Sequence, residues 1–310
     1  MPMVIDWHSH HTAPELIEKL SALGARAPSP DPFDSPDFTR RVGELDEAGI
    51  DVQLVSQGAG LDADRLPGNS PLSWMRELNN VMAKRVAPHT GRLSGTVAVS
   101  LQHPDESARE IERMAGNGFR AVLIYARGSL LARPDAGSIF AALEQTGLPV
   151  FLHGGGGTPE RDPSLQLLEG EGQGVVVSAH ADAAVTDCVV RLIASGILDR
   201  YPNVQVVIRS GGGGIPLLLN KLYWKHQGPN GERRYSDILK EHFLVDTASV
   251  SARTLQFLLD TMGEDRVVFG SDYCGGLGPL PKGMRAVEEH PDPDYVRTVT
   301  ERSSRQLLKL

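Results

Sequence analysis

Residues 4–10 of this 310-residue chain read Val-Ile-Asp-Trp-His-Ser-His, a run of β-forming residues that leads into a His-x-His pair. Alternate residues of a β-strand point to the same side. His8 and His10 therefore face the same way at the end of a strand, where two imidazoles can share one divalent metal. The same pair is compatible with polar residues that merely end a strand, so the rest of the chain has to distinguish the two interpretations.

The composition is that of an ordinary globular protein with ample core, at 40% hydrophobic and 23% charged residues. A net charge of -8 without any basic cluster argues against a nucleic-acid partner or an anionic membrane surface. The two cysteines, Cys188 and Cys274, are too few for a disulfide framework. Together with the absence of a signal-peptide pattern, they predict a cytoplasmic protein. No apolar run reaches the ~20 residues that a membrane helix needs.

Eight strand-like segments alternate with segments of helical periodicity. The predicted strands cover residues 4–10, 50–56, 93–101, 119–125, 149–153, 204–208, 243–248 and 266–269, and the predicted helices cover residues 15–23, 37–48, 70–86, 104–117, 138–146, 184–194, 215–225, 251–262 and 294–308. Near-continuous apolar runs such as Val-Gln-Val-Val-Ile are typical of parallel strands buried on both faces. The pattern predicts an α/β fold, a (β/α)8 TIM barrel of the metal-dependent hydrolase type, with residues 1–310 as a single domain. A doubly wound open sheet is the alternative, but no G-x-G-x-x-G follows the first strand.

The residues that leave each strand are the ones to inspect, because a (β/α)8 barrel keeps its active site at the carboxyl ends of its strands. The strand at 149–153 ends in His153, and the strand at 266–269 is followed by Asp272. With His8 and His10 they make three imidazoles and one carboxylate, which suit Zn²⁺ and, less exclusively, Mn²⁺, Fe²⁺ or Co²⁺. Each residue alone could be an ordinary strand end or turn, whereas four ligand types at one barrel mouth predict a metal site.

Five motifs make nearly the whole chain resemble the amidohydrolase superfamily. They are residues 5–10 (Ile-Asp-Trp-His-Ser-His), 148–153 (Leu-Pro-Val-Phe-Leu-His), 195–202 (Ser-Gly-Ile-Leu-Asp-Arg-Tyr-Pro), 211–216 (Gly-Gly-Gly-Gly-Ile-Pro) and 265–273 (Asp-Arg-Val-Val-Phe-Gly-Ser-Asp-Tyr). The chain is most similar to the amidohydrolase 2 type, in the branch of aminocarboxymuconate-semialdehyde decarboxylase and related non-oxidative decarboxylases. That resemblance implies a homodimeric enzyme whose single metal is bound by His8, His10, His153 and Asp272. Two-metal members use a carbamylated lysine at the end of strand four, and residues 119–125 contain no lysine.

The resemblance implies non-oxidative decarboxylation of a small unsaturated or aromatic carboxylic acid, with Asp272 also acting in catalysis. Hydrolysis of a small amide, ester or lactone is the alternative, because a metal at a barrel mouth can also generate hydroxide. A third interpretation, a metal-binding pseudoenzyme, arises from a departure: the branch has a catalytic histidine before the glycine run, where this chain has Ser210. Serine is a poor base near neutral pH unless another group activates it.

Three other residues are candidates for the role of the missing histidine. His180 belongs to a long Gly-rich loop expected after the fifth strand, from residue 154 to about residue 177 and beyond; it either folds over the site or is a solvated loop histidine. His11 more readily packs in the first loop. Arg209 stays protonated and cannot act as a base, but its guanidinium can bind a carboxylate bidentately.

The remaining candidates each have two interpretations. Ser210 is expected within hydrogen-bond reach of the reacting groups without being the general base. Arg127, which leaves the fourth strand, either binds a substrate carboxylate or forms a surface ion pair. Trp7 either walls the substrate pocket or packs in the core, and Cys274 is expected to be a small buried residue rather than a nucleophile.

Overall fold

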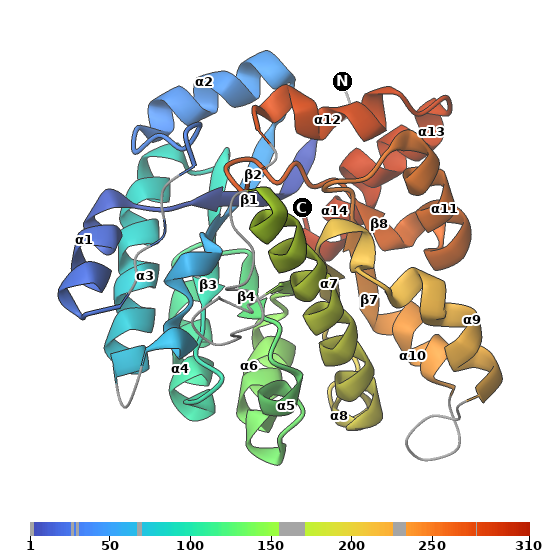
Figure 1. Ribbon diagram of the computed structural model, residues 1–310, viewed down its shortest axis with the longest axis horizontal. Helices are drawn as coiled ribbons and strands as arrows, with labels where there is room; N and C mark the ends of the chain where they lie inside the picture. Colours follow the sequence, from blue (N-terminus) through green and yellow to red (C-terminus); the bar gives the residue numbers. More distant parts are fainter. Residues whose placement is uncertain are drawn as a thin grey trace.

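Eight parallel strands form one sheet in the sequence order β1 to β8 in this computed structural model, which describes residues 3–25, 28, 31–66, 70–154, 171–225, 234–276 and 278–310 (Figure 1). The strands are β1 (Ile5–His11), β2 (Val52–Gln57), β3 (Leu93–Ala98), β4 (Ala121–Tyr125), β5 (Val150–His153), β6 (Val206–Ile208), β7 (Phe243–Asp246) and β8 (Val267–Val268). The sheet closes where β1 meets the segment after β8. There the amide of Trp7 donates to the carbonyl of Phe269 at 2.9 Å, and the amide of His10 to that of Tyr273 at 2.8 Å. The prediction of a (β/α)8 barrel is confirmed.

Helices surround the strands on the outside of the barrel (Figure 1). They are α1 (Pro14–Ala22), α2 (Phe38–Ala48), α3 (Ser70–Val86), α4 (Pro104–Ala115), α5 (Gly128–Leu131), α6 (Gly137–Thr146), α7 (Glu171–Ala194), α8 (Ile197–Arg200), α9 (Ile215–Lys225), α10 (Tyr235–His242), α11 (Ala252–Met262), α12 (Leu280–Glu288), α13 (Pro293–Arg297) and α14 (Ser303–Leu308). Local sequence explains their ends: α2, for example, begins after Asp37, whose side chain accepts from the amide of Thr39, and ends at the left-handed Gly49. Within the described ranges, none of these helices is both long and apolar enough to span a bilayer.

The core has two layers, one inside the barrel and one between the strands and the helices. The inner layer comprises Ile5, Trp7, Leu54, Ala121, Leu123, Tyr125, Phe151, Val207, Leu244, Val268 and Leu308. Helix α14 covers the amino end of the barrel, since Leu308 joins this layer and the indole Nε1 of Trp7 donates to Ser304 Oγ at 2.8 Å. The inner side chains therefore fill the barrel from its amino end, and the carboxyl ends of the strands remain for the polar residues.

Helix α7 differs most from the expectation. It begins at Glu171, whereas the sequence predicted a loop to about residue 177 and a helix only from residue 184. Ala181, Val185 and Cys188 are buried and recur at helical spacing, so the apolar face continues about one turn upstream of the predicted start. Residues 175–180 are exposed or half-buried, so these turns carry no apolar periodicity that would predict them. His180 consequently lies on a helix, and its placement in a loop was wrong. Residues 155–170 of the predicted loop lie outside the described residues.

The other differences concern short elements. Helices α5, α8, α10 and α12 were not predicted, because they span only four to nine residues and offer little periodicity to detect. The predicted helix at 294–308 is present as α13 and α14, joined by a π-helical turn at Thr298–Arg302. Strand β8 is shorter than the predicted 266–269. The assignment of residues 1–310 to one domain stays a prediction.

A cavity of about 490 Å³ lies at the amino ends of β5 to β8, lined among others by Pro149, Gln205, Arg266, Ser303 and Lys309. These residues precede their strands or belong to the C-terminal helix, so the cavity opens at the end of the barrel opposite to His153. In (β/α)8 barrels the amino ends of the strands usually contribute to stability, and the chemistry takes place at the carboxyl ends.

Gly95 in β3 provides a test of the packing between strands and helices. A Cβ at this position would lie 2.5 Å from Cε1 of Phe119 and 2.7 Å from Cγ of Met82, both buried. We expect Gly95→Val to lower the free energy of unfolding by about 1–3 kcal/mol in urea denaturation, because overpacking displaces its neighbours. Gly43→Ala in α2 is the control: its Cβ meets nothing within 4 Å, and alanine should stabilise the helix by ~0.5–1 kcal/mol. Equal losses in both variants would contradict the packing explanation.

Candidate metal centre

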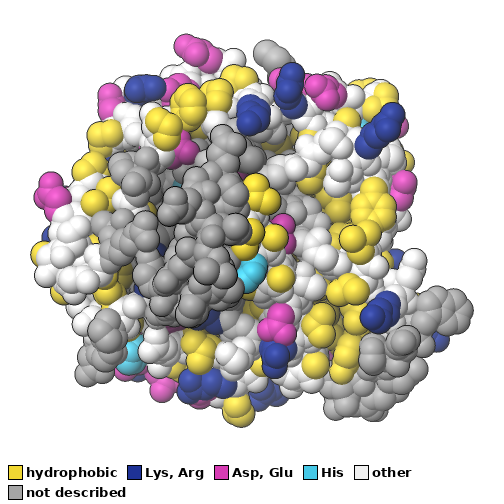
Figure 2. All heavy atoms as spheres, in the orientation of Figure 1, with side chains coloured by type: hydrophobic (Ala, Val, Ile, Leu, Met, Phe, Trp, Pro, Cys, Tyr) yellow, Lys and Arg dark blue, Asp and Glu magenta, His cyan; other side chains and the backbone are white. Residues whose placement is uncertain are grey.

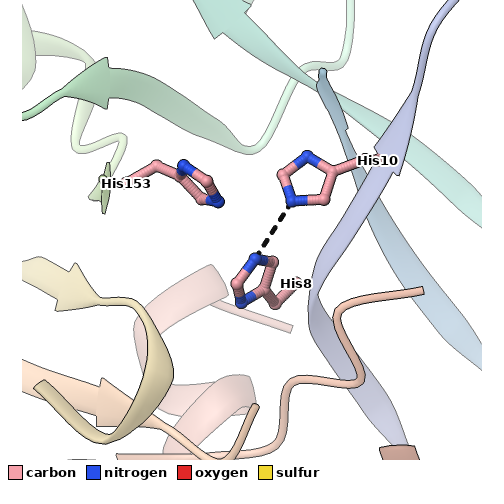
Figure 3. A group of neighbouring side chains, drawn as sticks. All are labelled: His8, His10 and His153. Atoms are coloured by element: carbon pink, nitrogen blue, oxygen red, sulfur yellow. Dashed lines mark hydrogen bonds between the residues drawn. The ribbon is translucent and has the colours of Figure 1, made fainter. Parts of the chain in front are cut away.

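Three buried imidazoles converge at the carboxyl ends of β1 and β5 (Figure 3). His8 and His10 lie two residues apart on β1 and point to the same side, as the sequence predicts, and His153 is the last residue of β5. The Nε2 atoms of His8 and His10 are 3.1 Å apart, and one nitrogen from each of the three rings lies within 4.8 Å of the others. Two nitrogens bound to one tetrahedral zinc are about 3.3 Å apart, which the first pair already approaches.

Asp272 completes this group from the segment after β8. Its Oδ1 lies 3.1 Å from Nε2 of His8 and 3.2 Å from Nε2 of His10. The backbone of Asp272 is left-handed, with φ of 53°, and the chain then turns back against its own carboxylate. A Cβ at Gly275 would lie 1.8 Å from Asp272 Oδ1, so only glycine allows this return. The four residues predicted as ligands from the strand ends are therefore neighbours.

Hydrogen bonds to the outer ring nitrogens orient two of the histidines. Nδ1 of His8 lies 2.8 Å from Oδ2 of Asp246, and Nδ1 of His153 lies 3.0 Å from the carbonyl oxygen of Gly154. Both partners are acceptors, so each Nδ1 carries a proton and each Nε2 is the nitrogen left to bind a cation at the centre. Protein metal sites commonly hold histidine ligands in this way. The donor set and its tautomers thus fit one divalent cation.

The charges of the centre also favour a cation. Burial lowers the pKa of His8, but the carboxylates of Asp246 and Asp272 outweigh it and raise the pKa to about 10. Burial alone would raise the pKa of Asp272, yet His8 and His10 hold it well below its usual value. Burial, with His10 and Arg209 nearby, keeps the pKa of His153 well below its usual value. The carboxylates therefore stabilise positive charge between these rings, and a bound divalent cation would displace the proton of His8.

Asp246 is the functional residue that the sequence analysis missed. It ends β7 and is fully buried. Besides its contact with His8, its Oδ1 accepts hydrogen bonds from the amides of Ser210 at 2.7 Å and Ala248 at 2.9 Å. The predicted strand ran to residue 248, so Asp246 fell inside it and was not inspected as a residue that leaves a strand. An aspartate at a strand end has many ordinary explanations, and only the contact with His8 shows what it does.

Ser210 and Arg209 lie beside this centre, at the end of β6. Ser210 has a left-handed backbone, with φ of 51°, and its Oγ accepts a hydrogen bond from Nε of Arg209 at 2.9 Å. The Arg209 guanidinium contacts the residue that follows His153, since a Cβ at Gly154 would lie 2.8 Å from Nη1 of Arg209. The structure brings these two predicted residues to the centre.

The other predicted site residues lie apart from the three imidazoles. Arg127 forms an ion pair with Asp62, and its Nε lies 4.0 Å from Asp64, so its charge is balanced locally. Trp7 is fully buried in the inner layer of the core, and His180 is exposed on α7. Their assignment to substrate binding or catalysis stays a prediction. The surroundings of Trp7 match its alternative interpretation, core packing, and Arg127 forms an ion pair that is largely buried and not at the surface.

Two residues behave as the sequence analysis expected. His11 points away from the centre, where its Nδ1 lies 2.7 Å from Oδ1 of Asp34, so it packs at the base of the first loop. Cys274 is buried, and burial raises the pKa of its thiol to about 12, which disfavours the thiolate that a nucleophile needs.

Comparison with known proteins places the chain among metal-dependent barrels. The profile of the amidohydrolase family matches residues 5–293. The chain is 28% identical over 258 residues to the gamma-resorcylate decarboxylase of Rhodococcus jostii, covering 75% of this chain and 76% of that protein. It is 26% identical over 255 residues to the 2-amino-3-carboxymuconate-6-semialdehyde decarboxylase of Dictyostelium discoideum, covering 79% of this chain and 68% of that one.

A solved structure shows the same fold around a metal. The dihydroxybenzoic acid decarboxylase of a Polaromonas species, with bound manganese and the inhibitor 2-nitroresorcinol, superposes with a TM-score of 0.83. It is 20% identical and covers 100% of this chain and 98% of its own. The resemblance predicted from the five motifs is confirmed, both for the family and for the branch of non-oxidative decarboxylases.

Metal analysis of variants tests the centre. We expect His10→Ala and Asp272→Ala to lose the bound divalent ion, because each removes a ligand, and Asp246→Asn to weaken metal affinity by about 10–100-fold, because it loosens His8. His180→Ala, on an exposed helical position, should keep the metal content of the wild type. Affinity is measured by competition with a chelator. Wild-type affinity in Asp246→Asn, or full metal content in His10→Ala, would contradict the assignment.

Proposed function

This chain belongs to the amidohydrolase family, and from this premise we propose that it is a metal-dependent, non-oxidative decarboxylase of a small aromatic or unsaturated carboxylic acid. One observation carries the proposal: a buried set of His8, His10, His153 and Asp272 at the carboxyl ends of the strands, arranged to bind a cation. The curated relatives support it, because gamma-resorcylate and carboxymuconate-semialdehyde decarboxylases remove CO₂ from such acids.

We assign the metal to these four ligands. Zinc suits three imidazoles and a carboxylate, and manganese, iron or cobalt suit them less exclusively. The manganese bound by the Polaromonas relative supports a divalent first-row ion without selecting zinc. When bound, such an ion polarises an oxygen atom of the substrate and stabilises negative charge that develops on it.

The protein has to supply a proton in the same place. In the reaction, the bond between carbon and carboxylate breaks, its electron pair stays on the carbon, and a proton takes the position that CO₂ leaves. Asp272 is the group in position to carry that proton, because its Oδ1 lies 3.1 Å and 3.2 Å from Nε2 of His8 and His10 and the residue is 7% exposed at the centre. It accepts the proton of a bound hydroxyl group and returns it to the carbon.

Ser210 takes an orienting role in this proposal. Its Oγ already accepts from Arg209, so its own hydroxyl proton is available for donation to a substrate or water oxygen. Its amide donates a hydrogen bond to Oδ1 of Asp246, and Oδ2 of Asp246 accepts one from Nδ1 of His8. The residue that stands where the branch has a catalytic histidine thus supports the metal ligands and does not act as a general base.

Release of CO₂ is the direct test. We expect metal-loaded protein to release CO₂ from at least one acid in a panel of hydroxybenzoates and muconate semialdehydes, and His153→Ala to abolish it. Ser210→Ala should lower turnover by less than about 10²-fold, because general acid–base help of the usual size, ~10²–10⁴-fold, comes from Asp272. A loss in Ser210→Ala as complete as that in His153→Ala would contradict its orienting role. Hydrolysis of esters or lactones without CO₂ release would identify a hydrolase, and binding without turnover a pseudoenzyme.

We further propose a homodimer. Large apolar side chains are exposed on neighbouring helices, with Leu217 of α9 at 75% and Phe257 of α11 at 39% exposure. Figure 2 shows hydrophobic side chains on the side where Figure 1 places these helices. Such a patch is typical of an interface.

A cytoplasmic location stays a prediction from the two free, buried cysteines, for cell fractionation to test.

Light scattering tests the dimer. The wild type at micromolar concentration should have twice the mass of the chain, and Leu217→Glu should shift it towards the monomer by placing a charge in the interface. Leu23→Glu, at a similarly exposed leucine outside this patch, should remain dimeric. A monomeric wild type would contradict the proposal.

A further inference from the structure

Arg209 brings a permanent positive charge to the wall of the candidate metal centre. Its amide donates to the carbonyl of Leu152 at 3.1 Å, which fixes the end of β6 beside the end of β5. From there the side chain reaches Gly154, next to the ligand His153, and its exposure is only 14%. A guanidinium stays charged at any physiological pH, so this wall is cationic whatever occupies the centre.

Among the described residues, the Arg209 guanidinium makes a hydrogen bond through Nε, and its Nη1 and Nη2 groups remain available to a ligand. Nε donates to Oγ of Ser210 at 2.9 Å. The carboxylate paired with it among the described residues is that of Asp182 on α7, and Oδ1 of Asp182 lies 3.8 Å from Nη2, too far for a hydrogen bond. Asp182 Oδ1 is itself buried without a hydrogen-bond partner in the described part of the chain. Nη1 and Nη2 can therefore present a fork to an acidic ligand.

Arg127, unlike Arg209 within the described ranges, already donates a hydrogen bond to a carboxylate. Asp62 accepts directly from its guanidinium, and Asp64 lies close by on the same side. Asp62 and Asp64 are both buried, so this pair is a fixed part of the structure. Of the two arginines at the carboxyl ends of the strands that the sequence analysis singled out, Arg209 is the one prepared for a ligand.

The chemistry of decarboxylation decides which acidic group Arg209 binds. The departing carboxylate loses its negative charge as it becomes CO₂, so a guanidinium paired with it would stabilise the substrate more than the transition state and slow the reaction. An acidic group that remains on the product keeps its charge throughout, and binding it positions the substrate without opposing the reaction. A fixed fork of two N–H groups matches a carboxylate in particular.

We propose that Arg209 selects substrates that carry a second carboxylate, one that stays on the product. This inference rests on the proposed decarboxylase function for its choice of carboxylate. Ser210 positions the guanidinium through Nε, and Asp182 balances its charge when no ligand is bound. The substitution of the branch's histidine by Ser210 therefore accompanies a specificity for acids with two carboxylates.

Calorimetry on the metal-loaded, full-length protein tests the selection without turnover. The probes are benzoate and the 1,2-, 1,3- and 1,4-benzenedicarboxylates. We expect the best dicarboxylate to bind at least 10-fold more tightly than benzoate to the wild type, in line with a charged bidentate hydrogen bond. Arg209→Gln should reduce this ratio to within about twofold, through a loss in affinity for the dicarboxylate, with benzoate affinity and metal content unchanged.

Further variants separate binding from effects on folding or net charge. Arg209→Lys keeps the charge without the fork and should retain an intermediate preference. Asp182→Asn removes the competing carboxylate and should tighten dicarboxylate binding severalfold. Arg191→Gln changes the net charge by the same amount as Arg209→Gln; because Arg191 is exposed on α7 and paired with Asp187, this control should keep the wild-type ratio.

Two results would overturn the proposal: an unchanged ratio in both Arg209 variants, or equal losses for benzoate and the dicarboxylates in Arg209→Gln. The second result would mean that Arg209 binds the single carboxylate that both probes share. The outcome is distinguishable from failure of the proposed function. If no acid releases CO₂ while Arg209→Gln still erases the preference, the decarboxylase proposal fails and the selection by Arg209 stands.

Discussion

The pairing of the first strand with the segment after the last one is the constraint on which the centre depends. The buried carboxylate of Asp6 lies at this junction and accepts from the amide and Oγ of Ser271 at 2.9 and 2.6 Å. It also accepts from Nε2 of Gln53 at 2.7 Å and from the amide of His8 at 3.1 Å. Burial raises the pKa of Asp6 in spite of these bonds. One carboxylate thereby links β1, β2 and the residue before Asp272. Closing the barrel therefore also brings the four proposed metal ligands together.

A second layer of polar residues fixes the first strand from behind. Arg41 of α2 is 1% exposed, and it donates to the carbonyl of His10 at 2.5 Å and to Oε1 of Gln53 at 2.8 Å. Its guanidinium also lies over the ring of Tyr273. A buried charge is tolerated only where such partners satisfy it. The strand that carries His8 and His10 is thus held by a carboxylate and a guanidinium, both of which contact the side chain of Gln53 on β2.

The departure at Ser210 has a physical consequence for the wall of the site. A hydroxyl group is smaller than an imidazole, and here it is bonded to the neighbouring Arg209 and, through its amide, to Asp246. In place of an imidazole that can titrate near neutral pH, this wall therefore has the permanent charge of Arg209, which Ser210 holds in position. Such a wall binds anions more strongly and moves protons less readily, in line with the proposals that Asp272 carries the proton and Arg209 recognises the substrate.

The barrel could be predicted from eight apolar strands that alternate with helices. The four proposed ligands could be predicted as well, because His8, His10 and His153 end strands and Asp272 follows one. His8 and His10 were certain to share a face, because two residues along a strand return to the same side. The short helices could not be predicted, since a few residues carry little periodicity. The first turns of α7 could not be predicted either, because Gly172 and Gly174 interrupt the helical pattern there.

The partners of the polar residues, in contrast, are set by contacts between distant parts of the folded chain. Asp62 neutralises Arg127, while Arg209 keeps its outer donors, and Asp246 turns out to hold His8 across 238 residues of chain. Nothing in the local sequence of these residues distinguishes them. The physical reason is that the charge state and availability of a side chain depend on what lies within a few ångströms of it, and closure of the barrel chooses those neighbours from distant parts of the chain.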